Sequence, residues 1–183
     1  MKKIIILLAF FLPALVQAQK TQDTKKYEPQ MEISLVGGIK KYKMPDVISP
    51  LYGIEASFQC PLAKSSRASI RQHFKFTHQQ AEKLASTTIE INPQYIILSK
   101  SNIKLGIGPS AGLIFAKINE DRKTIFSYGL GTSSAYYIKN ISIGVGVCYA
   151  MTNKISSANT KSASATVIRL NNWSTSLQLG YKF

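Results

Sequence analysis

Two histidines, His73 and His78, are the side chains of this sequence best suited to acid–base catalysis or metal binding. No cluster of metal-ligating residues surrounds either one. His73 falls on the polar side of an alternating run, and His78 opens a polar stretch, residues 78–85, that predicts a loop. We therefore predict no catalytic residue, no metal site and no cofactor-binding site.

Glycine pairs are the other pattern that could indicate chemistry, because glycine-rich loops bind phosphates. A phosphate loop needs a helix directly after it, and no helical periodicity follows any of these pairs. We therefore interpret them as parts of strands. The pairs are Gly106-Ile107-Gly108, Gly129-Leu130-Gly131 and Gly144-Val145-Gly146.

The first residues have the pattern of an export signal. Lys2 and Lys3 precede an apolar run over residues 4–15, and Val16-Gln17-Ala18 forms a small-residue cleavage site. The alternative is a membrane anchor, but the run is shorter than the ~20 residues that span a bilayer. We predict a signal peptide over residues 1–18, cleaved after Ala18, and a flexible periplasmic lead-in over residues 19–29.

The chain of 183 residues is strongly basic, with 23 Lys and Arg against 9 Asp and Glu and a net charge of +14. Basic proteins often bind nucleic acid, but export makes that partner improbable here. Anionic lipid head groups and lipopolysaccharide phosphates fit an exported protein better. A basic surface that is simply solvated is the alternative.

Apolar and polar residues alternate in eight segments of the chain, and these segments would position the histidines and the glycine pairs. Apolar side chains occupy one face and polar side chains or glycine the other, as in residues 141–152 and in the closing run Trp173–Phe183. We predict a single all-β domain over residues 30–183. Its strands are expected at residues 30–40, 51–60, 67–77, 86–98, 102–118, 124–138, 141–152 and 173–183.

Alternation alone suits both a transmembrane barrel and a soluble exported barrel of the lipocalin kind. A soluble core needs large interior side chains, whereas one face here is rich in glycine. Aromatic residues gather near both ends of the apolar faces, as the girdles of a membrane barrel do. One group is Tyr52, Phe74, Phe76, Phe115, Phe126, Tyr128 and Tyr149; the other is Phe58, Tyr95, Tyr136, Tyr181 and Phe183. The predicted fold is an eight-stranded antiparallel transmembrane β-barrel with short periplasmic turns.

The polar faces would line the inside of this barrel. Eight strands leave a lumen just wide enough for side chains, so we expect it to be filled; a gated or ligand-binding lumen is the alternative. Buried charges need partners, and Glu55 and Glu90 could pair with Arg71 and Lys75. Residues expected inside are Glu55, Arg67, Arg71, His73, Lys75, Glu90, Asn92, Gln94 and Lys104, facing a wall of Gly106, Gly108, Gly112, Gly129, Gly131, Gly144 and Gly146.

The two cysteines, Cys60 and Cys148, could form a disulfide in an oxidising compartment. Strand phase places them on opposite faces of the wall, however. We therefore predict two free thiols.

The last strand, which ends on Phe183, resembles the closing strand of outer-membrane β-barrels. Residues 30–183 as a whole resemble the small outer-membrane barrel proteins, the group of OmpX, the OmpA barrel and the PorT-like proteins. The resemblance implies an outer-membrane location in a Gram-negative envelope and recognition of the C-terminal strand by the barrel assembly machinery. It favours a non-enzymatic role through basic outer loops that contact lipopolysaccharide or a partner. The basic residues are Lys41, Lys43, Lys117, Arg122, Lys123, Lys154 and Lys161.

Two other functions stay open. The PorT-like resemblance implies an accessory of a protein secretion system. A lipid-modifying enzyme is the other, since Pro93 and Pro109, predicted cross-strand neighbours, are similar to the prolines that open the wall of the lipid A palmitoyltransferase family. Proline cannot donate to a strand ladder, so the ladder should be broken there, by a β-bulge or by a lateral opening. The His, Ser and acid set of outer-membrane lipid deacylases is missing beside His73 and His78.

Overall fold

A computed structural model describes most of the predicted domain. The described residues are 30–43, 46–61, 69–81, 84–100, 102–118, 121–153, 155–157, 166–168 and 170–183. The predicted signal peptide, residues 1–18, and the lead-in, residues 19–29, lie outside them. The strands are β1 (Gln30–Tyr42), β2 (Val47–Pro61), β3 (Ser69–Ala81), β4 (Leu84–Lys100), β5 (Ile103–Ile118), β6 (Asp121–Ile138), β7 (Ile141–Thr152), β8 (Ile155–Ser157), β9 (Thr166–Ile168) and β10 (Asn172–Lys182).

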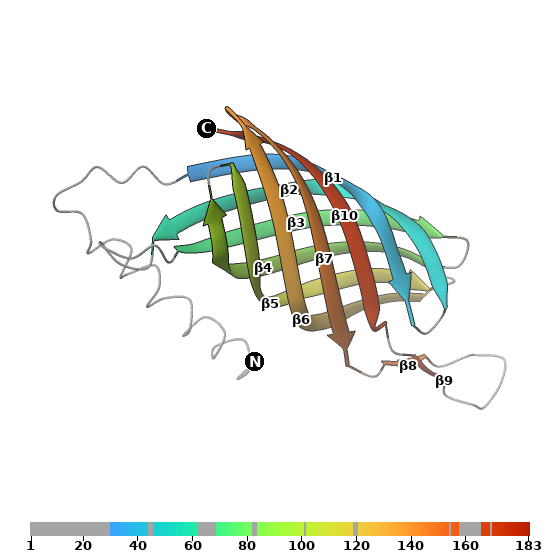
Figure 1. The fold of residues 1–183 in the computed structure, drawn as a ribbon. Helices are drawn as coiled ribbons and strands as arrows, with labels where there is room; N and C mark the ends of the chain where they lie inside the picture. The colour runs from blue at the N-terminus through green and yellow to red at the C-terminus, as the bar shows by residue number, and fades with distance from the viewer. Residues whose placement is uncertain are drawn as a thin grey trace.

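Eight of these strands form one closed antiparallel barrel in the order β1-β10-β7-β6-β5-β4-β3-β2 (Figure 1). The barrel closes between its first and last strands, where Ile33 lies opposite Tyr181 and Ile39 opposite Thr175. The small hairpin of β8 and β9 stands apart from the barrel, in the connection between β7 and β10. The predicted fold class is confirmed.

The two ends of the barrel differ in what they hold. The terminal end contains the start of β1 and the end of β10. There the Phe183 backbone N–H donates to the Met31 carbonyl at 3.0 Å. The opposite end, the loop end, contains the connection between β7 and β10, and the Lys43 N–H donates there to the Asn171 carbonyl at 2.8 Å. The strands are 11 to 18 residues long, more than the roughly 9–11 that cross a bilayer, so several extend beyond the apolar band.

One stretch of the loop end was predicted wrongly. His78 and the polar residues after it were expected in a loop over residues 78–85, but β3 continues to Ala81 and β4 begins at Leu84. His78 therefore lies in β3, paired with Thr87 of β4. The alternation of apolar and polar residues ends near Phe76, because the outward side chains beyond it no longer belong to the apolar outer surface. The backbone hydrogen-bond ladder between β3 and β4 nevertheless continues to Ala81 and Leu84.

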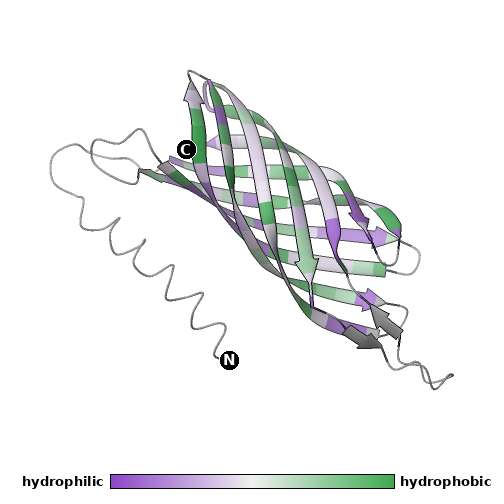
Figure 2. Cartoon of the chain, turned by 60° about the horizontal axis from the view of Figure 1, so that its bottom comes forward, coloured by the Kyte–Doolittle hydropathy of each residue, from purple (hydrophilic) through white to green (hydrophobic). Residues whose placement is uncertain are grey.

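The barrel has an apolar outer surface and a polar interior, the reverse of a soluble protein. Hydropathy alternates along the strands in Figure 2. Leu35, Ile54, Leu130, Leu177 and Leu179 are each more than half exposed, whereas most of the fully enclosed polar side chains come from the opposite strand faces. A surface of this kind is stable against lipid and would aggregate in water. No helix among the described residues is long and apolar enough to cross a membrane.

Candidate functional site

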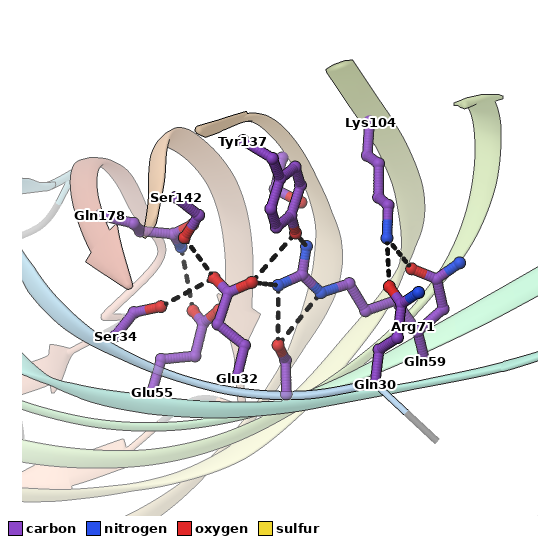
Figure 3. Close-up of polar contacts among 12 residues, drawn as sticks. Gln30, Glu32, Ser34, Glu55, Gln59, Arg71, Lys104, Tyr137, Ser142 and Gln178 are labelled. Atoms are coloured by element: carbon purple, nitrogen blue, oxygen red, sulfur yellow. Dashed lines mark hydrogen bonds and ion pairs between the residues drawn. The ribbon is translucent and has the colours of Figure 1, made fainter. Parts of the chain in front are cut away.

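The lumen at the terminal end is closed by a cluster of buried charged and hydroxyl side chains, which we call the terminal-end cluster. It consists of Glu32, Ser57, Arg71, Tyr137 and Ser142 (Figure 3). The Arg71 guanidinium forms an ion pair with Glu32 at 2.8 Å and donates two hydrogen bonds to the Ser57 hydroxyl, at 3.0 and 2.8 Å. One cation thus ties together β1, β2 and β3.

The same carboxylate reaches the far side of the lumen. Glu32 accepts hydrogen bonds from the Tyr137 hydroxyl at 3.0 Å and from the Ser142 hydroxyl at 2.6 Å. Arg71 also donates to the Tyr137 hydroxyl. Because Tyr137 and Ser142 belong to β6 and β7, the cluster joins opposite walls of the barrel. Glu32 and Arg71 are 6% and 5% exposed, so this ion pair is held away from water.

The predicted partner of Arg71 was wrong. We expected Glu55 or Glu90, and the structure pairs Arg71 with Glu32. Glu90 is in no ion pair among the described residues, while the pairing of Lys75 with Glu55 is confirmed at 3.4 Å. Strand phase places a side chain inside, but the tilt of the strands decides which residues of non-adjacent strands meet. Arg67, also expected inside, lies outside the described residues.

A second buried cluster fills the middle of the lumen. The Glu55 carboxylate lies 2.7 Å from His73 Nδ1 and 3.4 Å from Lys75 Nζ, and it accepts a hydrogen bond from Gln178 Nε2 at 2.9 Å. His73 and Lys75 are on β3, whereas Gln178 comes from β10 on the other side of β1. The predicted interior positions of Glu55, His73 and Lys75 are confirmed.

Glycines on β5 and β6 provide the space for long polar side chains of β4, the strand next to β5. A Cβ atom at Gly131 would lie 2.0 Å from Asn92 Nδ2, and one at Gly106 would lie 2.7 Å from Gln94 Oε1. Other lumen glycines have a different role, since a Cβ at Gly108 or Gly129 would meet the backbone of the adjacent strand at 1.8 Å. The predicted glycine wall was expected to face charged side chains from the opposite wall, but it faces uncharged ones from nearby strands: Asn92 and Gln94 at Gly131 and Gly106, and Gln178 at Gly144 and Gly146. At Gly108, Gly112 and Gly129 glycine permits close strand approach.

An apolar cap covers the lumen at the loop end. Its members are Tyr42, Leu84, Ile114, Ala116, Ile125 and Leu170, all nearly or fully buried. Leu170 comes from the connection between β7 and β10, where its N–H donates to the Thr152 hydroxyl at 2.9 Å. The Tyr42 hydroxyl is hydrogen-bonded to the Ser86 hydroxyl at 3.0 Å, so this polar atom has a partner although it lies within the apolar cap. Sequence analysis missed this cap, because its inward apolar residues interrupt the polar face only at the strand ends.

The described residues leave little space at the terminal-end mouth of the lumen. The cavity at the terminal-end mouth has a volume of about 10 Å³, close to the minimum that one water molecule needs. Lys104 narrows this mouth further by donating to Gln30 at 2.7 Å and to Gln59 at 2.6 Å (Figure 3). Between the two closures most described interior polar side chains are hydrogen-bonded or ion-paired, whereas Glu90 Oε1 and His73 Nε2 are buried without a described partner.

The two histidines have different surroundings, one inside the lumen and one on the outer wall. His73 is 3% exposed inside the lumen, and the Ser57 opposite it accepts its hydrogen bonds from Arg71. His78 lies on the outer wall and is hydrogen-bonded through Nδ1 to Thr87 Oγ1 at 3.0 Å. Among the described residues, no group of three or more His, Cys, Asp or Glu could hold a metal ion.

The two opposed prolines interrupt the ladder between β4 and β5. The register pairs Ile91 with Ala111 and Tyr95 with Ile107, and no pairing is present between these positions. Pro93 and Pro109 face each other in that gap, and the loss of the two hydrogen bonds they cannot donate accounts for it. The predicted break is confirmed. The nearest β-bulge falls later, between Ile96 and Leu98.

Both cysteines are free, as predicted. Cys148 is buried inside, with its Sγ 3.5 Å from the Ser110 hydroxyl. Cys60 is only half-buried and belongs to β2, which is not adjacent to β7 in the barrel. The wall therefore separates the two thiols.

Comparison with known proteins identifies the fold. No family model matches the sequence, and a search of curated proteins finds no significant match. Among solved structures, Neisserial surface protein A (NspA) is similar with 16% identity and a TM-score of 0.60, over 85% of this chain and 97% of that one. The N-terminal β-barrel domain of Pseudomonas aeruginosa OprF has 16% identity and a TM-score of 0.53, over 85% and 100%.

An enzyme has the same fold. The outer membrane enzyme PagL is similar with 13% identity and a TM-score of 0.51, over 82% of this chain and 98% of that one. At these identities the likeness concerns the fold alone. The chain has the fold of the small eight-stranded outer-membrane barrels, and the expected resemblance to the OmpX and OmpA barrels is confirmed at that level.

Proposed function

We propose that this protein is a non-enzymatic outer-membrane barrel with a closed lumen, which acts as a structural element and a surface contact through basic groups at its loop end. The observation that carries the proposal is the combination of an apolar outer wall with a polar interior that holds the ion pairs Arg71–Glu32 and Lys75–Glu55. The apolar wall fits lipid, and the filled lumen leaves the ends of the barrel as the surfaces where it can meet partners.

The proposed orientation places the terminal end in the periplasm and the loop end outside. It follows from the long connection between β7 and β10, because the longer connections of outer-membrane barrels are extracellular. Lys43, Lys117 and Arg122 are then exposed on the outer side, whereas Lys123 is half-buried. Lys41 is also there but is paired with Asp46 at 3.4 Å. Lys154 and Lys161 lie outside the described residues.

At the terminal end, Phe183 is 69% exposed and its ring lies 5.1 Å from that of Tyr181 in an edge-on arrangement. We propose that this exposed aromatic end is the segment that the barrel assembly machinery recognises. A secretion accessory of the PorT-like kind is a further candidate role. A protein-secretion assay on a deletion strain separates it from a purely structural one.

The enzymatic alternative needs a catalytic group that faces lipid. The described outer wall offers His78 hydrogen-bonded to Thr87, without an acidic side chain on that histidine, while the His73–Glu55 pair is enclosed. The unpaired stretch at Pro93 and Pro109 is the observation that favours lateral lipid entry. Mass spectrometry of lipid A from a deletion strain tests this alternative, since unchanged acylation excludes it.

Conductance in planar bilayers tests the proposed closure. We expect the folded barrel to insert without producing steady channels, because the terminal-end cluster and the apolar cap fill both mouths. A 16-stranded porin inserted under the same conditions serves as the positive control. Steady, reproducible channels from this protein would contradict a closed lumen.

A further inference from the structure

The outer wall has a recess at the loop end, of about 420 Å³, that the lumen does not explain. It lies over β3, β4, β5 and β6, and its lining combines basic, hydroxyl and aromatic side chains. The lining residues that matter here are His78, Ala85, Thr87, Phe115, Lys117 and Arg122.

Strand register arranges this wall in three successive rows across the four strands. The row nearest the middle of the barrel is apolar and consists of Phe76, Ile89, Leu113 and Phe126. The next row is mixed and consists of His78, Thr87, Phe115 and Thr124. The outermost row consists of Gln80, Ala85, Lys117 and Arg122. The recess therefore spans the transition from an apolar surface to a basic one.

The outermost row places two cations side by side. Lys117 and Arg122 are directly opposite each other on β5 and β6 and are both exposed. Like charges in this position destabilise a sheet unless an anion lies between them. No acidic side chain is among the described lining residues of the recess, and neither cation is in an ion pair with a described residue. The acidic residues nearest in sequence are Glu120 and Asp121, whose side chains are not described.

We propose that this recess binds a phosphate group of lipopolysaccharide in the outer leaflet, with Arg122 and Lys117 contacting the phosphate and His78 and Thr87 contributing from the row beneath. Arginine and lysine bind phosphate through charge-assisted hydrogen bonds. Phe115, at the boundary between the rows, contacts the apolar part of the same molecule. The small Ala85 and Thr87 leave the space that the headgroup occupies.

The depth of the site selects the lipid as the occupant. The recess is lined by the exposed Phe115 and Lys117. It lies next to the apolar row of Phe126, whose ring stacks with that of Tyr128 at a centroid distance of 6.3 Å. Aromatic side chains in this position mark the headgroup level of a bilayer. A ligand from bulk water would more readily reach the ends of the loops. The inference rests on the proposed outer-membrane location and names the lipid that the basic loop end contacts.

Binding is measured with the full chain folded in neutral detergent micelles. The probes are lipopolysaccharide with intact lipid A phosphates, the same lipopolysaccharide after enzymatic dephosphorylation, and inorganic phosphate. We expect the phosphorylated form to bind at least about tenfold more tightly than the dephosphorylated form, since the loss of one charge-assisted hydrogen bond weakens binding by about that factor. The double variant Lys117→Gln, Arg122→Gln should remove this preference.

Lys139→Gln serves as the matched control, because it removes a charge from the exposed turn at the terminal end, away from the recess. It should bind like the unchanged protein. The heat-dependent shift in gel migration confirms that every variant is folded.

Equal binding of the two lipopolysaccharides, or an unaltered preference in the double variant, would overturn the inference. Inorganic phosphate that competes as well as lipopolysaccharide would overturn the assignment to a lipid. If the barrel fractionates with the outer membrane but fails this binding test, only this inference is wrong. If the chain never reaches the outer membrane, the proposed function is wrong, whatever the chain binds in micelles.

Discussion

Replacing Arg71 by methionine should lower the free energy of unfolding by about 3–5 kcal/mol, because it leaves the Glu32 carboxylate charged and without its cation in the lumen. The Ser57 hydroxyl loses two donors in the same variant, and Tyr137 loses one. Urea titration of the barrel in lipid vesicles measures this change. The single tryptophan, Trp173, reports it, since it is 57% exposed on the outer wall and its fluorescence follows release from lipid.

The double variant Arg71→Met, Glu32→Gln separates a lost ion pair from lost packing. Removing both charges should restore much of the stability, because the cost of the single change lies in the unpaired carboxylate. Lys41→Met is the matched control for an ion pair in water. Its pair with Asp46 is largely exposed, so that variant should change stability by no more than about 1 kcal/mol. If Arg71→Met costs no more than Lys41→Met, the terminal-end cluster does not hold the walls together.

The second large effect concerns the outer wall. Leu177 is 66% exposed in the middle of β10, between Gly37 and Val145 on the neighbouring strands. Leu177→Arg should cost about 2–4 kcal/mol, because the change places a charge on the lipid face near the middle of the membrane. On a water-facing wall the same change would fall within about 0.5 kcal/mol. The same urea titration in vesicles distinguishes these two outcomes.

Ile48→Arg provides the matched control for depth. Ile48 is 62% exposed, almost as much as Leu177, but it lies at the loop end opposite Lys41. Arginine there should cost only about 0–1 kcal/mol, as it does near a membrane interface. Equal effects at the two positions would contradict a lipid-facing wall whose polarity changes with depth.

The alternation of residue types predicted most of the barrel. It is strong wherever one face of a strand meets lipid and the other meets the lumen, as in residues 141–152, which β7 reproduces. It fails where a strand leaves the apolar band, and His78 is the example. There, outward residues become polar while the backbone ladder continues, so residue pattern and strand end no longer coincide.

The interior was predictable by face but not by partner. Strand phase placed Arg71 and Glu55 inside, yet Arg71 pairs with Glu32, which lies on a strand not adjacent to its own. That contact depends on the closure of the barrel and on the tilt of its strands, which one strand's sequence does not encode. Tyr137 was missed for a similar reason: its neighbour Tyr136 faces lipid, and an aromatic pair gives no clear phase. The opposition of Pro93 and Pro109 was predictable, because the register between β4 and β5 follows from the short turn that joins them.

Fractionation of cells that express the full chain tests the central claim, that this is a lipid-embedded barrel with a polar interior. We expect the protein in the outer-membrane fraction, with gel migration that changes when the sample is boiled, because an intact barrel withstands detergent until it is heated. Recovery in the soluble periplasmic fraction, with the same migration before and after boiling, would contradict the account.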